Sequence, residues 1–193
     1  MIYPAKAENI DKAIELLLKG EIIVYPTDTL YGFGVDATNT NAIKKLNNLK
    51  KREQPLSIIL DNIKNIPKYS YISSKGILEL NNFLPGPYTI LLIKKESNLS
   101  SLVFAGSNKI GIRIPNHPFP IKIVEQFKRP IITTSINKHN QKSLNNIQQI
   151  KRNFPGINIF KDTFVKPSKG STIIDMALSP YKIIRKGDGD YSP

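Results

Sequence analysis

The sequence predicts an α/β fold in a single domain that spans residues 1–193. Segments with helical and with strand-like apolar spacing alternate along the chain, which is typical of this fold class. The chain is 40% hydrophobic, enough to bury a sizeable core at this length. It contains no internal repeat and no long linker that would divide it into two domains.

The first predicted helix starts near Ile10 and keeps apolar residues at helical spacing as far as Leu18. Asn9 precedes it as a candidate N-cap, and Gly20 follows it as a stop signal. The next residues, 21–25, are mostly apolar and predict a strand.

Residues 26–34 are dense in proline, hydroxyl residues and glycine, which predicts a turn. A second helix is expected over 40–51, and a strand over 56–60. The rest of the chain continues the alternation, with helical patterns over 77–83, 121–127 and 144–152, and strand candidates over 88–93, 110–114, 130–134, 171–175 and 181–185.

The composition excludes several kinds of chemistry. The chain has no cysteine, which rules out disulfides, thiolate metal sites and thiol catalysis, and its only histidines are His117 and His139. No apolar run is long enough to cross a bilayer and the N-terminus has no signal-like pattern, so we expect a cytoplasmic protein without a membrane partner. The formal net charge of +13 favours an anionic ligand, although a Lys-rich, Asn-rich and Ile-rich composition is an equally good explanation of it.

Five segments carry candidate functional residues. Each has a structural alternative, such as a polar turn, cations that offset a helix C-terminus, or a strand arginine that faces solvent. Arginine in an apolar strand, as at Arg113, needs either solvent or an anionic partner, because burial of an unpaired charge is expensive. The segments are Tyr25 to Gly34, Lys50 to Arg52, Gly111 to Pro115, Pro130 to Asn137, and Gly170 to Asp175 with Ile183 to Gly187.

Taken in order, these segments resemble the YrdC family over nearly the whole chain. The series that carries the resemblance is PTDTLYGFGVDA, LKKR with PLSIIL, LPGPYTILL, GIRIP, PIITTSIN, GSTIIDM and IIRKGD. The resemblance implies a twisted, mostly mixed β-sheet flanked by helices, with a basic concave surface that holds ATP beside threonine. It also implies the short, single-domain form of L-threonylcarbamoyladenylate synthase.

The resemblance assigns residues to two sides of the site. On the amino-acid side, Arg113 resembles the arginine that holds the threonine carboxylate, and Thr29, Thr133 and Ser171 resemble further threonine contacts. On the nucleotide side, Lys50 and Arg52 resemble a phosphate-binding pair that also carries the catalytic role, and the remaining ATP contacts are Ser135, Asn137, Ser143 and Arg185.

The sequence departs from the family pattern in two loops. The stretch after Arg52 is shortened, and the small residue usual after Ser135 is replaced by Ile136, with His139-Asn140 in place of Ser-Gly. A position often held by histidine is Ile59 here, and we assign it no threonine contact.

The implied reaction takes ATP, L-threonine and bicarbonate to threonylcarbamoyl-AMP and pyrophosphate, for t6A modification of tRNA position 37. Such a nucleotidyl transfer needs alignment of the reactants and neutralisation of charge more than it needs a protein nucleophile. Mg²⁺ is expected as the cofactor that accompanies ATP, with no metal site built by the protein. Asp28 and Asp175 are candidate outer-sphere carboxylates, with simple turn or cap roles favoured for both. tRNA and the downstream threonylcarbamoyl-transfer proteins are further possible partners.

Three other functions remain open at this stage. A related family member could bind a nucleotide without this activity, and the altered loops favour that alternative. A carbamoyltransferase of hydrogenase maturation is disfavoured by the absence of cysteine. A double-stranded RNA-binding protein would show strongly salt-dependent RNA affinity and no need for ATP.

Overall fold

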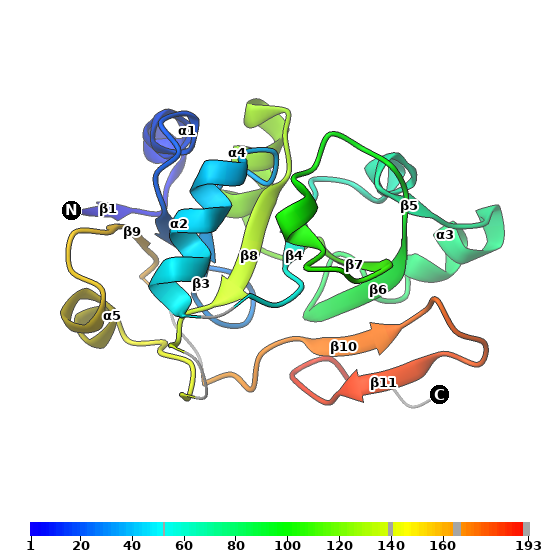
Figure 1. The fold of residues 1–193 in the computed structure, drawn as a ribbon. Coiled ribbons are helices and arrows are strands. Elements are labelled where there is room, and N and C mark those ends of the chain that lie inside the picture. Colours follow the sequence, from blue (N-terminus) through cyan, green and yellow to red (C-terminus); the bar gives the residue numbers. More distant parts are fainter. Residues whose placement is uncertain (52, 139–140, 164–166, 191–193) are drawn as a thin grey trace.

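A computed structural model describes residues 1–51, 53–138, 141–163 and 167–190. It contains one mixed sheet flanked by helices (Figure 1). The strands run in the order β1-β9-β2-β3-β8-β4-β7-β6-β10-β11, and β5 pairs with β6 off this path. Their bounds are β1 Ile2–Pro4, β2 Ile23–Tyr25, β3 Gly32–Gly34, β4 Ser57–Ile59, β5 Ser70–Tyr71, β6 Tyr88–Lys94, β7 Lys109–Arg113, β8 Ile131–Ser135, β9 Asn158–Lys161, β10 Thr172–Asp175 and β11 Lys182–Arg185.

The helices connect these strands across both faces of the sheet. The α-helices are α1 Ile10–Leu18, α2 Thr40–Lys50, α3 Ser74–Leu80, α4 Pro118–Phe127 and α5 Ile147–Asn153. Short 3₁₀ helices occur at η1 Ala7–Asn9, η2 Ile63–Lys68 and η3 Ser101–Val103. Parallel pairs (β4 with β7, β10 with β6) alternate with antiparallel ones (β4 with β8, β6 with β7), so the sheet is mixed, as the family resemblance implied.

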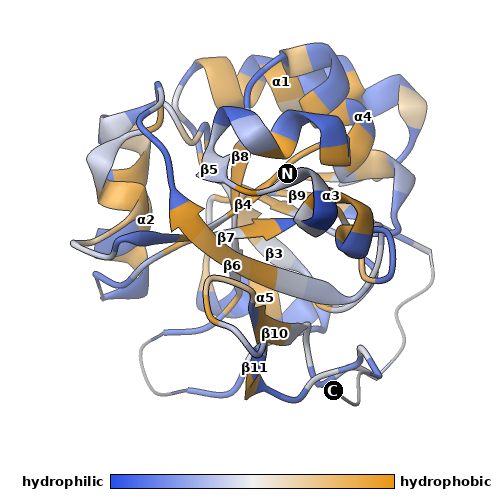
Figure 2. Ribbon diagram, turned by 90° about the vertical axis from the view of Figure 1, so that its right-hand side faces the viewer, coloured by the Kyte–Doolittle hydropathy of each residue, from blue (hydrophilic) through white to orange (hydrophobic). Residues whose placement is uncertain are grey.

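Alternation along the strands separates two hydrophobic clusters. Ile23 and Tyr25 pack with α1 and α4 on one face, whereas Val24 between them packs into the larger cluster that includes α2. Successive strand side chains point to opposite faces, which explains this division. In Figure 2 hydrophobic residues lie on the inner strands and in stripes along α1 and α4, the pattern of helices that cover a sheet.

The predicted elements are largely confirmed, with differences at their ends. α3 begins at Ser74 instead of residue 77, because Ser73 caps it by accepting a hydrogen bond from the Gly76 N–H. α4 begins at Pro118, with the His117 side chain as its cap. α5 begins only at Ile147, after the Asn146 cap.

Two predictions about the sheet were incomplete. The predicted turn over 26–34 ends in a real strand, β3, and the parallel pair β1 and β9 was not predicted at all. β3 and β1 are only three residues long, too short to show an alternating pattern. Among the described residues, no helix is long and apolar enough to cross a membrane.

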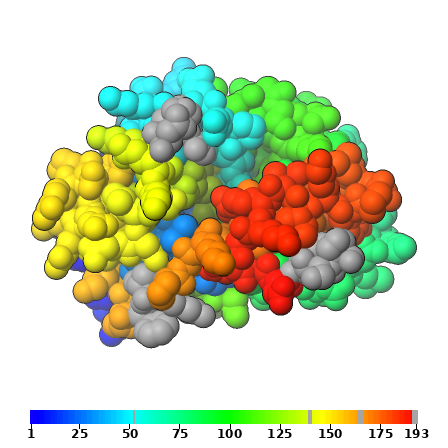
Figure 3. All heavy atoms as spheres, turned by 90° about the horizontal axis from the view of Figure 1, so that it is seen from below, coloured from blue at the N-terminus to red at the C-terminus, as the bar shows by residue number. Residues whose placement is uncertain are grey.

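The sheet brings the candidate segments to one hollow. Ser57 pairs with Gly111 and with Thr133, and Gly32 pairs with Ser135. Figure 3 shows the molecule from this side, with a hollow between α2 (cyan), the segment around α5 (yellow) and the C-terminal strands (orange to red).

Candidate active site

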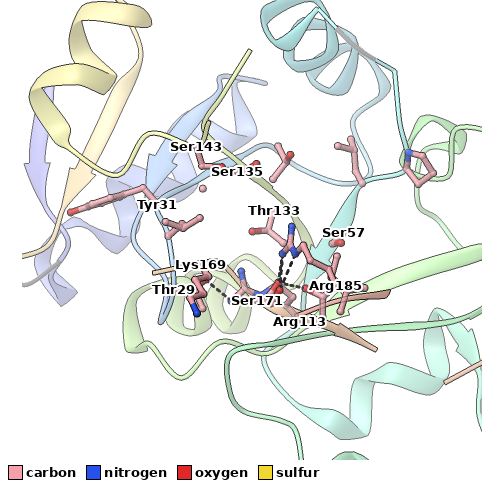
Figure 4. Close-up of a pocket in the computed structure, with 18 residues that line it drawn as sticks. Thr29, Tyr31, Ser57, Arg113, Thr133, Ser135, Ser143, Lys169, Ser171 and Arg185 are labelled. Carbon is pink, nitrogen blue, oxygen red and sulfur yellow. Dashed lines mark hydrogen bonds between the residues drawn. The ribbon is translucent and has the colours of Figure 1, made fainter. Parts of the chain in front are cut away.

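A cavity of about 210 Å³ lies in this hollow. Figure 4 shows the hydroxyls of Ser135 and Ser143 on one side of it, and Arg113, Ser171 and Arg185 on the other. Hydroxyl groups and cations dominate its wall, so it suits an anionic ligand that can accept many hydrogen bonds. The lining residues are Thr29, Leu30, Tyr31, Gly32, Pro55, Leu56, Ser57, Thr89, Arg113, Thr133, Thr134, Ser135, Ser143, Lys169, Gly170, Ser171, Ile173 and Arg185.

Arg113 stands at the end of β7, on the cavity side of the sheet. Its neighbours Ile112 and Ile114 pack into the larger hydrophobic cluster, which confirms that the arginine alone faces the cavity. The residue is only 7% exposed, and burial lowers the pKa of its guanidinium, although the nearby Asp28 carboxylate acts in the opposite direction. A buried guanidinium in the wall of a cavity is a ready site for a carboxylate.

Asp28 and Thr29 hold one edge of that guanidinium. Arg113 Nη2 donates to Asp28 Oδ1 at 2.8 Å and to Thr29 Oγ1 at 3.2 Å. The other oxygen of Asp28 accepts from the Asn116 N–H at 3.0 Å, which ties the turn after β2 to the turn after β7. Arg113 Nε is buried and has no hydrogen-bond partner among the described residues. The guanidinium therefore keeps unused hydrogen-bonding capacity.

Asp28 is the ion-pair partner of Arg113, a contact that the sequence did not show. Its carboxylate is buried to the same extent as the Arg113 side chain, each 9% exposed. It lies outside the lining of the first cavity and lines an adjacent one of about 500 Å³, which shares Thr29 and Tyr31 with the first. Asp28 thus supports the guanidinium from outside the first cavity.

Ser171 and Arg185 form the wall beside Arg113. Arg185 Nη2 donates to Ser171 O at 2.7 Å and to Ser171 Oγ at 3.1 Å, and Ser171 Oγ lies 2.8 Å from Thr89 Oγ1. Partial burial and then the like charge of Arg113 lower the pKa of Arg185. The two guanidinium groups are therefore close enough to repel each other, and an anion in the cavity would relieve that repulsion.

Thr133, Ser135 and Ser143 also line the cavity, as their assignment to substrate contacts requires. Thr133 is buried near the end of β8, and Ser135, its last residue, donates from Oγ to Asn137 Oδ1 at 2.9 Å. Ser143 is exposed and belongs to the segment before α5. Of the residues assigned to the site by resemblance, Thr29, Arg113, Thr133, Ser135, Ser143, Ser171 and Arg185 meet in this cavity.

Lys50 and Asn137 lie behind the cavity wall. Lys50 is 1% exposed, and its Nζ donates to Ser135 O, to Asn137 O at 3.1 Å and to Asn137 Oδ1 at 2.9 Å. An ammonium group has three N–H donors, so these acceptors can use all of them. Asn137 also donates from Nδ2 to Gln141 O at 2.9 Å. Both residues hold the loop that carries Ser135, while Arg52 and His139 lie outside the described residues.

Lys169 is a cavity residue that the sequence interpretation missed. It immediately precedes the Gly170-Ser171 motif, and this adjacency is the signal that could have identified it. Ser57 and Thr89 were missed as well, because each sits inside a strand pattern that looked purely structural.

The cavity offers no preformed metal site. Its lining contains no Asp or Glu, and nowhere in the described part of the chain do three His, Asp or Glu side chains gather around one point. Mg²⁺ prefers oxygen ligands and keeps several waters. The residues present therefore fit a metal ion carried by substrate phosphates better than one held by the protein.

Fold and cavity together define an α/β protein with a cavity suited to a small anionic ligand where several strands end. Residues 15–187 match the sequence model of the Sua5/YciO/YrdC family, described as telomere recombination. The chain belongs to this family. A Methanocaldococcus jannaschii relative is 36% identical over 96% of this chain and 91% of its own. The threonylcarbamoyl-AMP synthase of Wigglesworthia glossinidia brevipalpis is 32% identical over 94% of this chain and 95% of its own.

Solved structures agree with the fold. P. abyssi Sua5 complexed with L-threonine superposes with a TM-score of 0.89 at 25% identity, over 97% of this chain and 57% of that one. The chain thus spans little more than half of the P. abyssi protein. E. coli YciO superposes with a TM-score of 0.88 over 98% of this chain and 97% of that one, and at 21% identity it supports the fold alone.

Proposed function

We propose that this protein is a threonylcarbamoyl-AMP synthase. It converts L-threonine, bicarbonate and ATP, taken up with Mg²⁺, into threonylcarbamoyl-AMP and pyrophosphate. The observation that carries the proposal is the buried Arg113 guanidinium in the wall of a hydroxyl-lined cavity. One edge of this guanidinium donates hydrogen bonds to Asp28 and Thr29. Relatives that align over almost the whole chain carry the same activity in their names.

The amino-acid side of the site is built around Arg113. A guanidinium binds a carboxylate through two parallel N–H donors, and Thr29, Thr133 and Ser171 supply hydroxyls around it. Threonine held in this way leaves its amino group in the cavity. There the amine reacts with bicarbonate, and an N-carboxylate and water are formed.

The second step joins this N-carboxylate to the nucleotide. One of its oxygens attacks the α-phosphorus of ATP, the bond from that phosphorus to the bridging oxygen breaks, and pyrophosphate leaves with both electrons of that bond. The protein's part is to align the reactants and neutralise charge. Arg185 provides a cation in the wall, and Ser135 and Ser143 provide hydroxyl contacts for the nucleotide.

Lys50 contributes to this site by supporting the loop with Ser135 and Asn137. Arg52 keeps its proposed role as a phosphate ligand. The product, threonylcarbamoyl-AMP, is the intermediate for t6A modification of tRNA. It is used by the proteins that transfer the threonylcarbamoyl group to tRNA. The absence of a carboxylate in the described wall supports a role for Mg²⁺ as part of the MgATP substrate.

The assay that tests the proposal is release of pyrophosphate from ATP, measured with each amino acid in turn and with bicarbonate present or removed. We expect release that requires both threonine and bicarbonate, together with an adenylate product visible by mass spectrometry. Serine is the informative control, because it differs from threonine by one methyl group, worth about 1 kcal/mol or more of binding. Equal release with all amino acids, or none with threonine, rules out the synthase.

A further inference from the structure

We propose that Lys169 binds a phosphate group of the nucleotide. The proposal rests on the proposed function in two respects, namely that the nucleotide enters the cavity of about 210 Å³ and that Arg113 holds the threonine carboxylate. Among the described residues, the cations in the cavity wall are Arg113, Lys169 and Arg185. Lys50, the lysine first assigned to phosphate, lies behind the wall with its Nζ on three oxygen atoms of the 135–137 segment.

The three wall cations differ in whether their charge is compensated. Arg113 forms an ion pair with Asp28 at 2.8 Å. Arg185 donates only to the neutral oxygens of Ser171, and neither it nor Lys169 has an ion-pair partner in the part of the chain that the structure describes. Two such cations in one small cavity favour an anionic ligand, because the carboxylate beside Lys169, that of Asp188, offsets only part of their charge.

A phosphate fits Lys169 better than the threonine carboxylate does. Arg113 is almost fully buried, presents a planar fork and already serves the carboxylate. Lys169 is exposed, and its ammonium is a mobile point charge, which suits the looser, more solvated phosphates of a nucleotide. Its Nζ makes no hydrogen bond or ion pair to any described residue and can therefore turn toward such a group.

Hydrogen bonds hold the backbone at Lys169, whereas its side chain makes none to a described residue. Its N–H donates to Asp188 Oδ1 at 2.8 Å, and Ser168 Oγ donates to the other oxygen of the same carboxylate. The Asp188 N–H in turn donates to Gly170 O at 2.8 Å. A cation on a rigid backbone loses less entropy on binding than one on a mobile loop. It also follows that a change of the Lys169 side chain leaves these structural contacts in place.

The test compares Lys169→Gln with Lys169→Arg and with the control Lys182→Gln. Lys182 is an exposed lysine on β11 that does not line the cavity, so its replacement removes the same charge without the proposed contact. The measurement is the dissociation constant of a non-hydrolysable ATP analogue with Mg²⁺, by calorimetry, because it does not depend on turnover. Threonine affinity is measured in parallel without nucleotide.

We expect Lys169→Gln to weaken the analogue about tenfold, as for loss of one charge-assisted contact, with threonine affinity unchanged. Lys169→Arg should recover most of the affinity, and Lys182→Gln should resemble the wild type. The effect should shrink as salt is raised, since an exposed cation is screened.

Two outcomes for the variants would overturn the proposal: equal effects of Lys169→Gln and Lys182→Gln on binding of the analogue, or loss of threonine affinity in place of nucleotide affinity. A wild-type protein that binds no ATP analogue would overturn it too. Failure of the synthase assignment is separate, since it would show as analogue binding without threonine-dependent pyrophosphate release.

Discussion

At the scale of single residues, burial and partners distinguish the roles of the cations near the cavity. Lys50 and Arg113 are both almost fully buried, yet Lys50 donates to neutral oxygens of a loop and Arg113 to a carboxylate in the neighbouring turn. Unpaired buried charges are expensive, so each has acquired oxygen partners. Only Arg113 retains a donor without a partner, and it is also the one that lines the cavity.

This difference leads to a prediction for Arg113. Arg113→Lys should raise the threonine concentration needed for half-maximal pyrophosphate release by about tenfold or more, because a lysine keeps the charge and loses the planar fork. The ATP requirement should change little. Steady-state kinetics with each substrate varied in turn measure both quantities.

Asp28→Asn provides a related variant for comparison. The amide keeps the shape of the carboxylate but removes its charge and one of its two acceptor oxygens, so it keeps the contact to Arg113 or the one to Asn116 and not both. Stability should therefore fall, while threonine binding should weaken less than in Arg113→Lys. Circular dichroism would monitor the fold.

Normal threonine kinetics in Arg113→Lys would show that Arg113 is structural and that the amino-acid pocket lies elsewhere.

At the scale of elements, the loop after β8 depends on the end of α2. Lys50 is the last residue of α2, and it reaches across to the end of β8 and to Asn137. Asn137 then donates to Gln141 O, which extends the connection toward the segment before α5. The shape of this part of the cavity therefore depends on a contact between elements far apart in the sequence.

The dependence predicts that Lys50→Met lowers stability as well as nucleotide use. Methionine fills the space but leaves the partly buried carbonyl oxygens of Ser135 and Asn137 without this donor, which should cost about 2 kcal/mol of unfolding free energy. Urea unfolding measures this cost. Lys44→Met is the matched control, since Lys44 is an exposed residue of the same helix. Full stability with strongly weakened ATP binding would instead make Lys50 a direct phosphate ligand.

At the scale of the whole molecule, the sequence predicted which segments form strands better than it predicted how those strands pair. β6 is a seven-residue strand with a continuous apolar stretch, and that pattern is sufficient to identify it. The parallel partnership of β1 with β9 depends on packing between the two ends of the chain, which no local pattern records.

The site shows the same limit. Arg113 and Ser171, both assigned by the resemblance, line the same cavity, whereas the ion pair to Asp28 and the place of Lys169 depend on side-chain directions in the folded protein. Lys50 is buried behind the cavity wall. Because lysine side chains are rarely buried, the sequence alone predicted an exposed side chain at this position.

The net charge of +13 is a property of the whole molecule, and it affects how strongly the protein would bind RNA. A basic surface binds nucleic acid through its phosphates and releases counterions, so the affinity for tRNA should fall roughly tenfold between about 50 and about 200 mM salt even if only two phosphates are contacted. Pyrophosphate release needs no such surface, because all of its reactants are small. We therefore expect full threonine-dependent release without RNA at both salt concentrations, while tRNA affinity, measured by fluorescence anisotropy, decreases. Pyrophosphate release that required RNA, or that showed the same salt dependence as RNA binding, would contradict a synthase that completes its reaction without RNA. Such a result would favour the alternative of a double-stranded RNA-binding protein.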